Sequence, residues 1–206
     1  HASTFAFYPN KQITTGEGGV LATDDDHLAR MARSLRNQGR GENGSWLAHE
    51  RLGFNYRMSD INCALGLSQL GRLGEFVRKR ADVARRYNAL LAEVPEVIAP
   101  PDYRDGTMSW FVYVIRLADR FTRDQRDAVL EGLRPRGIGC NNYFTPVHLQ
   151  PFYRERLGTR EGDFPETERV AERTIALPFY NNLPEEDQQR VVATLREVLA
   201  DVESGC

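Results

Sequence analysis

Two lysines stand among the 27 basic residues of this 206-residue chain, and one of them has an unusual position for a surface charge. Lys79 lies in an Arg-Lys-Arg run, whereas Lys11 follows an aromatic, strand-like stretch at 3–8 and precedes a glycine-rich turn at 14–19. Lysine can become a nucleophilic amine, which arginine cannot, because arginine keeps its proton. Lys11 is therefore a candidate for Schiff-base chemistry. The alternative is a lysine at a strand end that extends its ammonium group into solvent.

The composition is that of a globular protein, with 41% hydrophobic and 27% charged residues. A formal net charge of −2 provides no electrostatic reason to bind nucleic acid. Basic clusters at 78–80 and 85–86 could form a stripe for nucleic acid, but acidic residues interleave with them. That mixture favours a solvated helix face, so we expect no nucleic-acid partner.

The three cysteines, Cys63, Cys140 and Cys206, are widely spaced and odd in number. They have neither the spacing of metal ligands nor that of a disulfide framework, which fits a reducing compartment. No apolar run approaches the roughly 18 residues of a membrane span, and no signal peptide is apparent. We therefore expect a cytoplasmic protein without a metal site or a membrane partner.

Two short strands, at 3–8 and 18–23, are predicted on either side of the Lys11 loop. Asp24 and Asp25 then supply the cap and the acidic first turn of a helix. A strand at the start of the chain needs neighbours. We therefore expect that a preceding part of the native protein is missing.

The longest helix signal begins at Ser59, a predicted N-cap, and continues without a proline until Pro95. A helix over 58–94 would be about 50 Å long, so it is expected to bridge two domains. Gly66, Gly71 and Gly74 lower helix propensity within it and suggest close packing against another backbone.

Prolines mark a linker at 95–101, after which a second α/β region is predicted. The apolar, β-forming run at 110–117 is typical of a buried strand. The remaining predicted elements are a helix from Thr122 to about 134, a strand at 138–144, a long loop around His148, and helices at 165–176 and 184–202.

Several segments carry a family resemblance. The segment 5–19, FAFYPNKQITTGEGG, closely resembles the active-site lysine segment of the DegT/DnrJ/EryC1/StrS family of pyridoxal-phosphate-dependent aminotransferases. Four further segments are similar to family motifs and follow in the family's order: RNQG at 36–39, GFNYR at 53–57, YFTPVH at 143–148 and LPFY at 177–180.

The resemblance implies an α/β protein of fold type I. Residues 1–57 would be the end of the large cofactor-binding domain, 58–94 the bridging helix, and 95–206 the small C-terminal α/β domain. Family members carry roughly the first half of their chain before the lysine. The resemblance thus implies a C-terminal portion, which would be inactive alone.

By the same resemblance, Lys11 holds pyridoxal 5′-phosphate as a Schiff base. An amino donor such as glutamate displaces the lysine, whose released amine then acts as the base. A nucleotide-linked keto sugar accepts the nitrogen in a second half-reaction, in amino-sugar, polysaccharide or antibiotic biosynthesis. Such a sequence gives ping-pong kinetics, with the cofactor as electron sink.

Other site residues are also implied by the resemblance. Asn55 would reach the cofactor phosphate of a partner subunit, which makes the enzyme a homodimer with shared sites; the alternative is a left-handed turn asparagine. Arg57 would bind a substrate diphosphate or carboxylate, or form a salt bridge at a helix start. Tyr143 and His148 lie on the segment that resembles the substrate loop, although His148 is equally compatible with a packed or solvated histidine.

The chain departs from the family pattern at two positions. Ala6 stands where the family usually has a serine that donates to the cofactor phosphate, and Gln38 replaces a histidine. Thr4 has the same parity as Ala6 along the strand and is the better substitute phosphate ligand.

Two alternatives within the fold follow. Dehydratase relatives replace the lysine by histidine, so Lys11 argues against them. A non-catalytic module that binds a sugar nucleotide or a partner chain is the second alternative.

Overall fold

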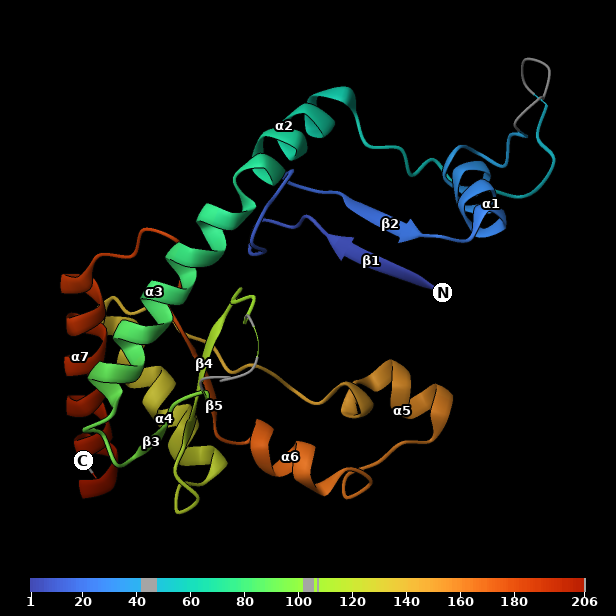
Figure 1. Ribbon diagram of the computed structural model, residues 1–206. Coiled ribbons are helices and arrows are strands. Elements are labelled where there is room, and N and C mark those ends of the chain that lie inside the picture. Colours follow the sequence, from blue (N-terminus) through green and yellow to red (C-terminus); the bar gives the residue numbers. More distant parts are fainter. Residues whose placement is uncertain (42–47, 102–105, 107, 206) are drawn as a thin grey trace. The chain divides into compact units, whose positions relative to one another are not determined.

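The computed structural model describes residues 1–41, 48–101, 106 and 108–205. The chain forms two compact units, His1–Phe76 and Val77–Cys206, and each combines helices with an antiparallel sheet (Figure 1). The boundary between the units falls inside a helix, and the limits 1–57, 58–94 and 95–206 stay predictions.

The first unit opens with the two predicted strands. Strand β1 (Ala2–Ala6) pairs antiparallel with β2 (Gly19–Thr23), and the Lys11 loop joins them. Helix α1 (Asp26–Arg36) follows, and the side chain of its N-cap residue Asp25 accepts a hydrogen bond of 3.0 Å from the N–H of Leu28. The cap satisfies an amide that has no partner within the helix, so the helix begins where predicted.

The helix predicted over 58–94 is divided in two. Helix α2 (Asp60–Gly71) begins at the predicted cap, where Ser59 Oγ accepts from the N–H of Asn62 over 3.2 Å, and α3 (Leu73–Leu91) follows. Arg72 between them has φ −106° and ψ 4°, outside the helical range. Gly71 directly precedes this interruption, as its low helix propensity favours.

The second unit contains a sheet with the strand order β3 (Val97–Ile98), β4 (Tyr113–Leu117), β5 (Thr174–Leu177). All neighbours are antiparallel, with Ile115 opposite Ile175. Strand β4 confirms the buried strand predicted at 110–117, although it begins at Tyr113.

Two predicted elements of this unit are wrong. The helix expected at 165–176 ends as α6 (Pro165–Ala171), and β5 follows, because the β-branched Thr174 and Ile175 pair with β4 instead of extending the helix. The strand expected at 138–144 is reduced to one bridge, Asn141 to Ala176. Glycine at 137 and 139 lowers strand propensity there.

The other helices of this unit follow the prediction more closely. Helix α4 (Arg123–Leu133) has a full capping box between Thr122 and Gln125, and α7 (Glu185–Ser204) matches the predicted final helix. The loop expected around His148 contains two short helices that were not predicted, η2 (Val147–Leu149) and α5 (Pro151–Leu157), and a further short turn, η1 (Arg134–Arg136), extends α4.

The large buried core belongs to the second unit, where α3, α4 and α7 contribute apolar side chains together with the sheet. Tyr87 and Tyr113 stack at its centre with ring centroids 4.8 Å apart. Burial raises the pKa of both phenols, so each stays a donor: Tyr87 to the carbonyl of Pro178 over 3.0 Å, and Tyr113 to Asn88 Oδ1 over 2.6 Å.

The first unit buries little apolar surface. Ile13 and Phe76 are its buried apolar residues within the described ranges, while Ile61 and Leu67 of α2 are 82% and 72% exposed.

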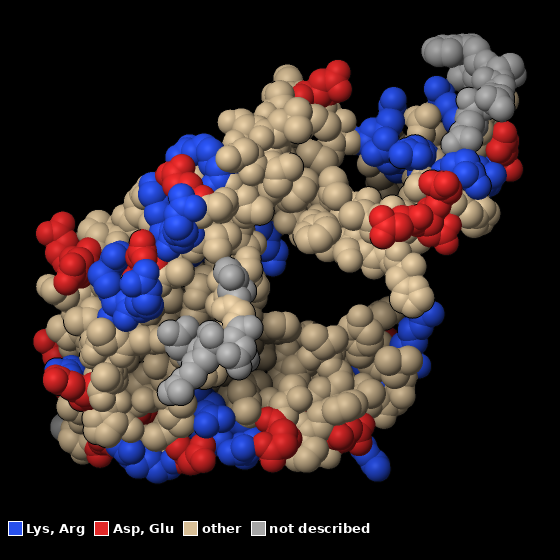
Figure 2. Space-filling model, in the orientation of Figure 1, with Lys and Arg blue, Asp and Glu red and all other residues tan. Residues whose placement is uncertain are grey.

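Acidic and basic side chains are interspersed over α3 (Figure 2), including an ion pair of Arg85 with Asp82. Arg78 and Arg85 are exposed, as the predicted solvated helix face requires. The prediction is wrong for Arg80, which is buried and donates to the carbonyl of Phe111 over 3.0 Å.

Candidate active site around Lys11

The Lys11 loop is closed by hydrogen bonds of its own backbone. The N–H of Lys11 donates to the carbonyl of Tyr8 over 3.0 Å. The N–H of Thr15 and the hydroxyl of Thr14 both donate to the carbonyl of Phe7, each over 3.0 Å. The loop therefore has a defined shape where β1 ends, and the Lys11 side chain is partly buried.

The glycine-rich turn after Lys11 requires glycine at two positions. Gly16 has φ +82°, a conformation that side chains disfavour. A Cβ on Gly18 would lie 2.5 Å from Thr15 Oγ1 and 2.9 Å from Met58 Cε. The turn thus packs against Met58, which directly precedes the cap of α2.

Helix α2 contacts the Lys11 loop at several points. Gln69 Oε1 accepts from the N–H of Thr14, and Asn62 Nδ2 donates to the carbonyl of Glu17, each over 3.4 Å. A Cβ on Gly66 would lie 3.1 Å from Thr15 Cγ2, and Thr15 is only 4% exposed. Gly66 therefore packs closely, but against a side chain and not against the backbone that was expected.

The expectation fails for Gly71, where an added Cβ would meet no atom of the described residues within 4 Å. Sequence reasoning missed Asn62 and Gln69 as supports of the loop. Their spacing with Gly66 in an otherwise apolar helix was the available signal.

Two motifs of the first unit bind each other. The N–H of Gln38 donates to the carbonyl of Phe54 over 2.8 Å, and the N–H of Tyr56 donates to the carbonyl of Arg36 over 2.9 Å. Asn37 and Asn55 form an antiparallel bridge. Asn55 is thus in extended backbone, and the left-handed residue is Gln38, with φ 63°.

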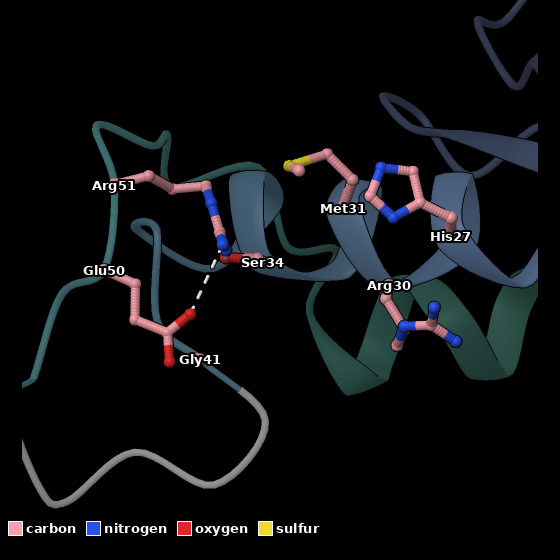
Figure 3. A pocket seen from close by; sticks show the side chains of 7 residues that line it. All are labelled: His27, Arg30, Met31, Ser34, Gly41, Glu50 and Arg51. Carbon is pink, nitrogen blue, oxygen red and sulfur yellow. Dashed lines mark hydrogen bonds and ion pairs between the residues drawn. The ribbon is translucent and has the colours of Figure 1, made fainter.

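Arg51 ties the same region to α1, as Figure 3 shows. Its Nη1 donates to Ser34 Oγ, and its Nη2 lies 3.3 Å from Glu50 Oε2. A cavity of about 300 Å³ lies beside these groups, lined by His27, Arg30, Met31, Ser34, Gly41, Glu50 and Arg51. None of the site residues predicted from the sequence lines this cavity.

Two of the predicted residues of the first unit, Asn55 and Arg57, lie just before the start of α2. Asn55 and Arg57 are exposed and lead into Met58, which touches the turn of the Lys11 loop. Thr4 is exposed on β1, two positions before Ala6 and opposite Leu21. Only the Gly18 end of the Lys11 loop meets this segment through Met58, so a common site of Lys11, Asn55 and Arg57 stays a prediction.

The two predicted residues of the second unit have different surroundings. Tyr143 is partly buried. Its ring packs edge to face with the ring of Phe111, and the two ring centroids are 6.4 Å apart. His148 is a packed histidine: its Nε2 lies 2.8 Å from Glu168 Oε1 and its side chain is 11% exposed. The Glu168 carboxylate, which sequence reasoning missed, also accepts from the N–H of Gly162, and this bond, followed by that to His148, lowers the pKa of Glu168.

Comparison with known proteins decides the family. A model of the DegT/DnrJ/EryC1/StrS aminotransferase family matches residues 1–196. The chain belongs to this family. The prediction of the family's α/β fold is therefore confirmed, and the lysine loop, the 53–57 turn and α2 all lie within the matched residues.

Three relatives illustrate the assignment. The spore coat polysaccharide biosynthesis protein SpsC of Bacillus subtilis is 34% identical over 208 residues, 96% of this chain and 54% of SpsC. The PLP form of the putative sugar aminotransferase Spr1654 of Streptococcus pneumoniae has a TM-score of 0.88 at 25% identity and covers 98% of this chain and 52% of its own. The structure of DesI with its TDP-sugar product has a TM-score of 0.83 at 29% identity. The match covers 99% of this chain and 51% of the DesI chain.

The chain thus spans about half the length of the relatives it matches. The cofactor prediction is confirmed at the level of the family, whose members depend on pyridoxal phosphate. The residues present fit that group, because Lys11 offers a partly buried primary amine on a loop of fixed shape.

Two negative findings concern only the part of the chain that the structure describes. No helix there is long and apolar enough to cross a bilayer, and His, Cys, Asp and Glu form no group of three that could hold a metal ion. Cys63 and Cys140 carry free thiols, while Cys206 lies outside the described residues.

Proposed function

We propose that the protein containing this chain is a pyridoxal-phosphate-dependent aminotransferase that moves an amino group from an amino acid such as glutamate to a nucleotide-linked keto sugar. The observation that carries the proposal is the position of Lys11, the lysine of the family motif, on a loop whose shape is fixed by its own backbone and by α2. The likeness to DesI, solved with a TDP-sugar product, supports the substrate class.

Lys11 performs the proton transfers in this proposal. Bound pyridoxal phosphate supplies the electron sink for the reacting carbon. Lys11 Nζ would attach the cofactor. Once the amino donor has displaced it, the free amine would carry a proton between the donor carbon and the cofactor carbon.

Asn55 and Thr4 are the proposed phosphate ligands. Asn55 is exposed in extended backbone, which leaves its side chain accessible to a ligand. We therefore propose a homodimer with shared active sites. Exposed apolar residues on α2, with Ile61 at 82% and Leu67 at 72%, support coverage of this unit by further protein.

Arg57, Tyr143 and His148 are the proposed substrate contacts. The exposed guanidinium of Arg57 suits a diphosphate, which it can bind through two parallel hydrogen bonds. His148 already engages Glu168 through Nε2, so Nδ1 is the ring nitrogen left for a substrate. The free thiols of Cys63 and Cys140 support a reducing compartment, and we propose the cytoplasm.

A half-reaction tests the proposal against a non-catalytic module. The protein expressed from its whole gene and loaded with pyridoxal phosphate should release about one equivalent of 2-oxoglutarate from glutamate without any acceptor. A nucleotide-linked keto sugar should then make the reaction catalytic. The Lys11→Ala variant should release none, and the Lys79→Ala variant should behave as the wild type. Sugar-nucleotide binding without release of the keto acid would support the module instead.

A further inference from the structure

We propose that Asn62, Gly66 and Gln69 of α2 form a positioning stripe that sets the location of the Lys11 amine. The inference rests on the proposed function, because it concerns the lysine that would carry the cofactor. It assigns to α2 a role in the reaction that goes beyond support of the fold.

The stripe follows the helical repeat. Its members are spaced by four and three residues, so they lie on one side of α2. They meet the loop in reverse order: Asn62 meets Glu17, Gly66 meets Thr15, and Gln69 meets Thr14. The loop therefore runs along the helix over two turns and is held at three successive points.

Each contact has a different chemistry. Gln69 accepts from the N–H of Thr14, and Gly66 leaves room for the methyl group of Thr15. Asn62 donates to the carbonyl of Glu17, which also accepts from Thr15 Oγ1 over 2.7 Å. A shift at any of these points would move the segment that follows Lys11.

The chemistry of the contacts argues that the stripe serves position more than core stability. A glycine and two side-chain amides of α2 meet the loop, and two of the three contacts are hydrogen bonds. Polar contacts of this kind fix geometry while contributing little net stability.

The path from the stripe to Lys11 is short. Thr14 and Thr15 are both bonded to the carbonyl of Phe7, and the Lys11 N–H is bonded to the carbonyl of Tyr8. A displacement of Thr15 would therefore move the backbone after Lys11 and, through the hydrogen bond to Phe7, the backbone before Lys11. Because the proposed function attaches the cofactor to this nitrogen, a displacement of Lys11 would change the surroundings of the bound cofactor.

The test uses the protein from its whole gene, loaded with pyridoxal phosphate. Gly66→Ala adds a Cβ that would lie 3.1 Å from Thr15 Cγ2, so the loop must yield. The pH midpoint of the bound cofactor's absorbance change should shift by about half a unit or more. Gly71→Ala is the matched control, because its Cβ would meet no described residue within 4 Å. The midpoint of this variant should equal that of the wild type.

Thr15→Ser provides the rescue, because it removes Cγ2 and keeps the hydroxyl that donates to the carbonyl of Glu17. The double variant Gly66→Ala/Thr15→Ser should return the midpoint toward the wild-type value. A Gly66→Ala midpoint equal to the wild type, or a shift that Thr15→Ser does not reverse, would overturn the inference. A variant that changes only the melting temperature would also count against it.

A second pair keeps the test decisive if Gly66→Ala does not fold. Gln69→Leu removes the acceptor for the N–H of Thr14 and should shift the pH midpoint. Gln69→Glu keeps an acceptor oxygen at this position and should shift the midpoint less. Hydrogen exchange of residues 9–18 without cofactor should be faster in Gln69→Leu. A wild-type protein without any cofactor band would contradict the proposed function, whereas a normal band that no variant changes would contradict the stripe alone.

Discussion

The N–H of Gln38 donates a hydrogen bond of 2.8 Å to the carbonyl oxygen of Phe54 and so joins the 36–39 motif to the turn that presents Asn55. Gln38 has φ 63° and Gly39 has φ +77°. The paired left-handed residues bend the chain at the end of α1, which brings its backbone onto the 53–57 turn. The first motif thus serves to hold the second.

Gly39 should be indispensable to this arrangement. A Cβ there would lie 1.8 Å from the carbonyl oxygen of Arg51, in a backbone conformation that side chains disfavour. Gly39→Ala should lower the free energy of unfolding by about 3 kcal/mol, measured by urea denaturation. The neighbouring control, Gln38→Gly, should be neutral or stabilising by up to about 1 kcal/mol. Equal stability of Gly39→Ala and wild type would refute this account of the bend.

Gln188 should be a main polar support of the second unit. The residue is fully buried, its Nε2 donates to the carbonyl of Val83 over 2.9 Å, and its Oε1 accepts from Arg86 Nε over 2.6 Å. Gln188→Leu should cost about 2 kcal/mol, because it leaves a charged donor without this acceptor. Gln189→Leu, on the exposed side of α7, should change stability by less than about 0.5 kcal/mol. A loss no larger at 188 than at 189 would contradict the prediction.

Acid should weaken the segment around α6 through Glu168. Its folded-state pKa is lowered, chiefly by the N–H of Gly162 and then by His148, so its contribution is fully present above the ordinary glutamate pKa of about 4.3. That contribution is lost as the pH falls through the lower folded value. Glu168→Gln should therefore be less stable than wild type at pH 7, and the difference should narrow toward pH 3. Urea midpoints at several pH values measure this.

The exposed Glu161 provides the control for the acid experiment. Glu161→Gln should follow the wild-type pH dependence. A Glu168→Gln profile parallel to that of the wild type would show that Glu168 is not the group responsible.

Local signals in the sequence predicted local structure well. The caps Asp25, Ser59 and Thr122 each begin a helix as expected, because a cap depends on residues within one turn. Strand β5 was mistaken for the end of a helix, since its identity depends on pairing with β4, which lies far away in the chain. The same limit applies to 138–144, where pairing stops after Asn141.

The sequence predicts those site residues that belong to a recognisable motif. Lys11, Asn55 and Arg57 belong to recognisable segments, and the turn after Lys11 meets Met58, which follows Arg57. The supports at Asn62 and Gln69 and the partnership of His148 with Glu168 join residues distant in sequence. Such pairs follow from tertiary packing, which single motifs do not encode.

The shared site can be tested by subunit complementation. If Asn55 serves the cofactor of the partner subunit, a mixed dimer of Lys11→Ala and Asn55→Ala subunits has one intact site and one doubly altered site. Random mixing of the two inactive or weakened variants should restore about a quarter of wild-type activity. Phosphate contact within one subunit would give no gain above the sum of the separate variants.

Covalent attachment of the cofactor to Lys11 is the most direct test. The protein from its whole gene, loaded with pyridoxal phosphate, reduced with borohydride and digested, should carry the pyridoxyl mass on the peptide that contains Lys11. The peptide with Lys79, the other lysine of this chain, should be unlabelled. A label on any residue other than Lys11, or no label at all, would contradict the account.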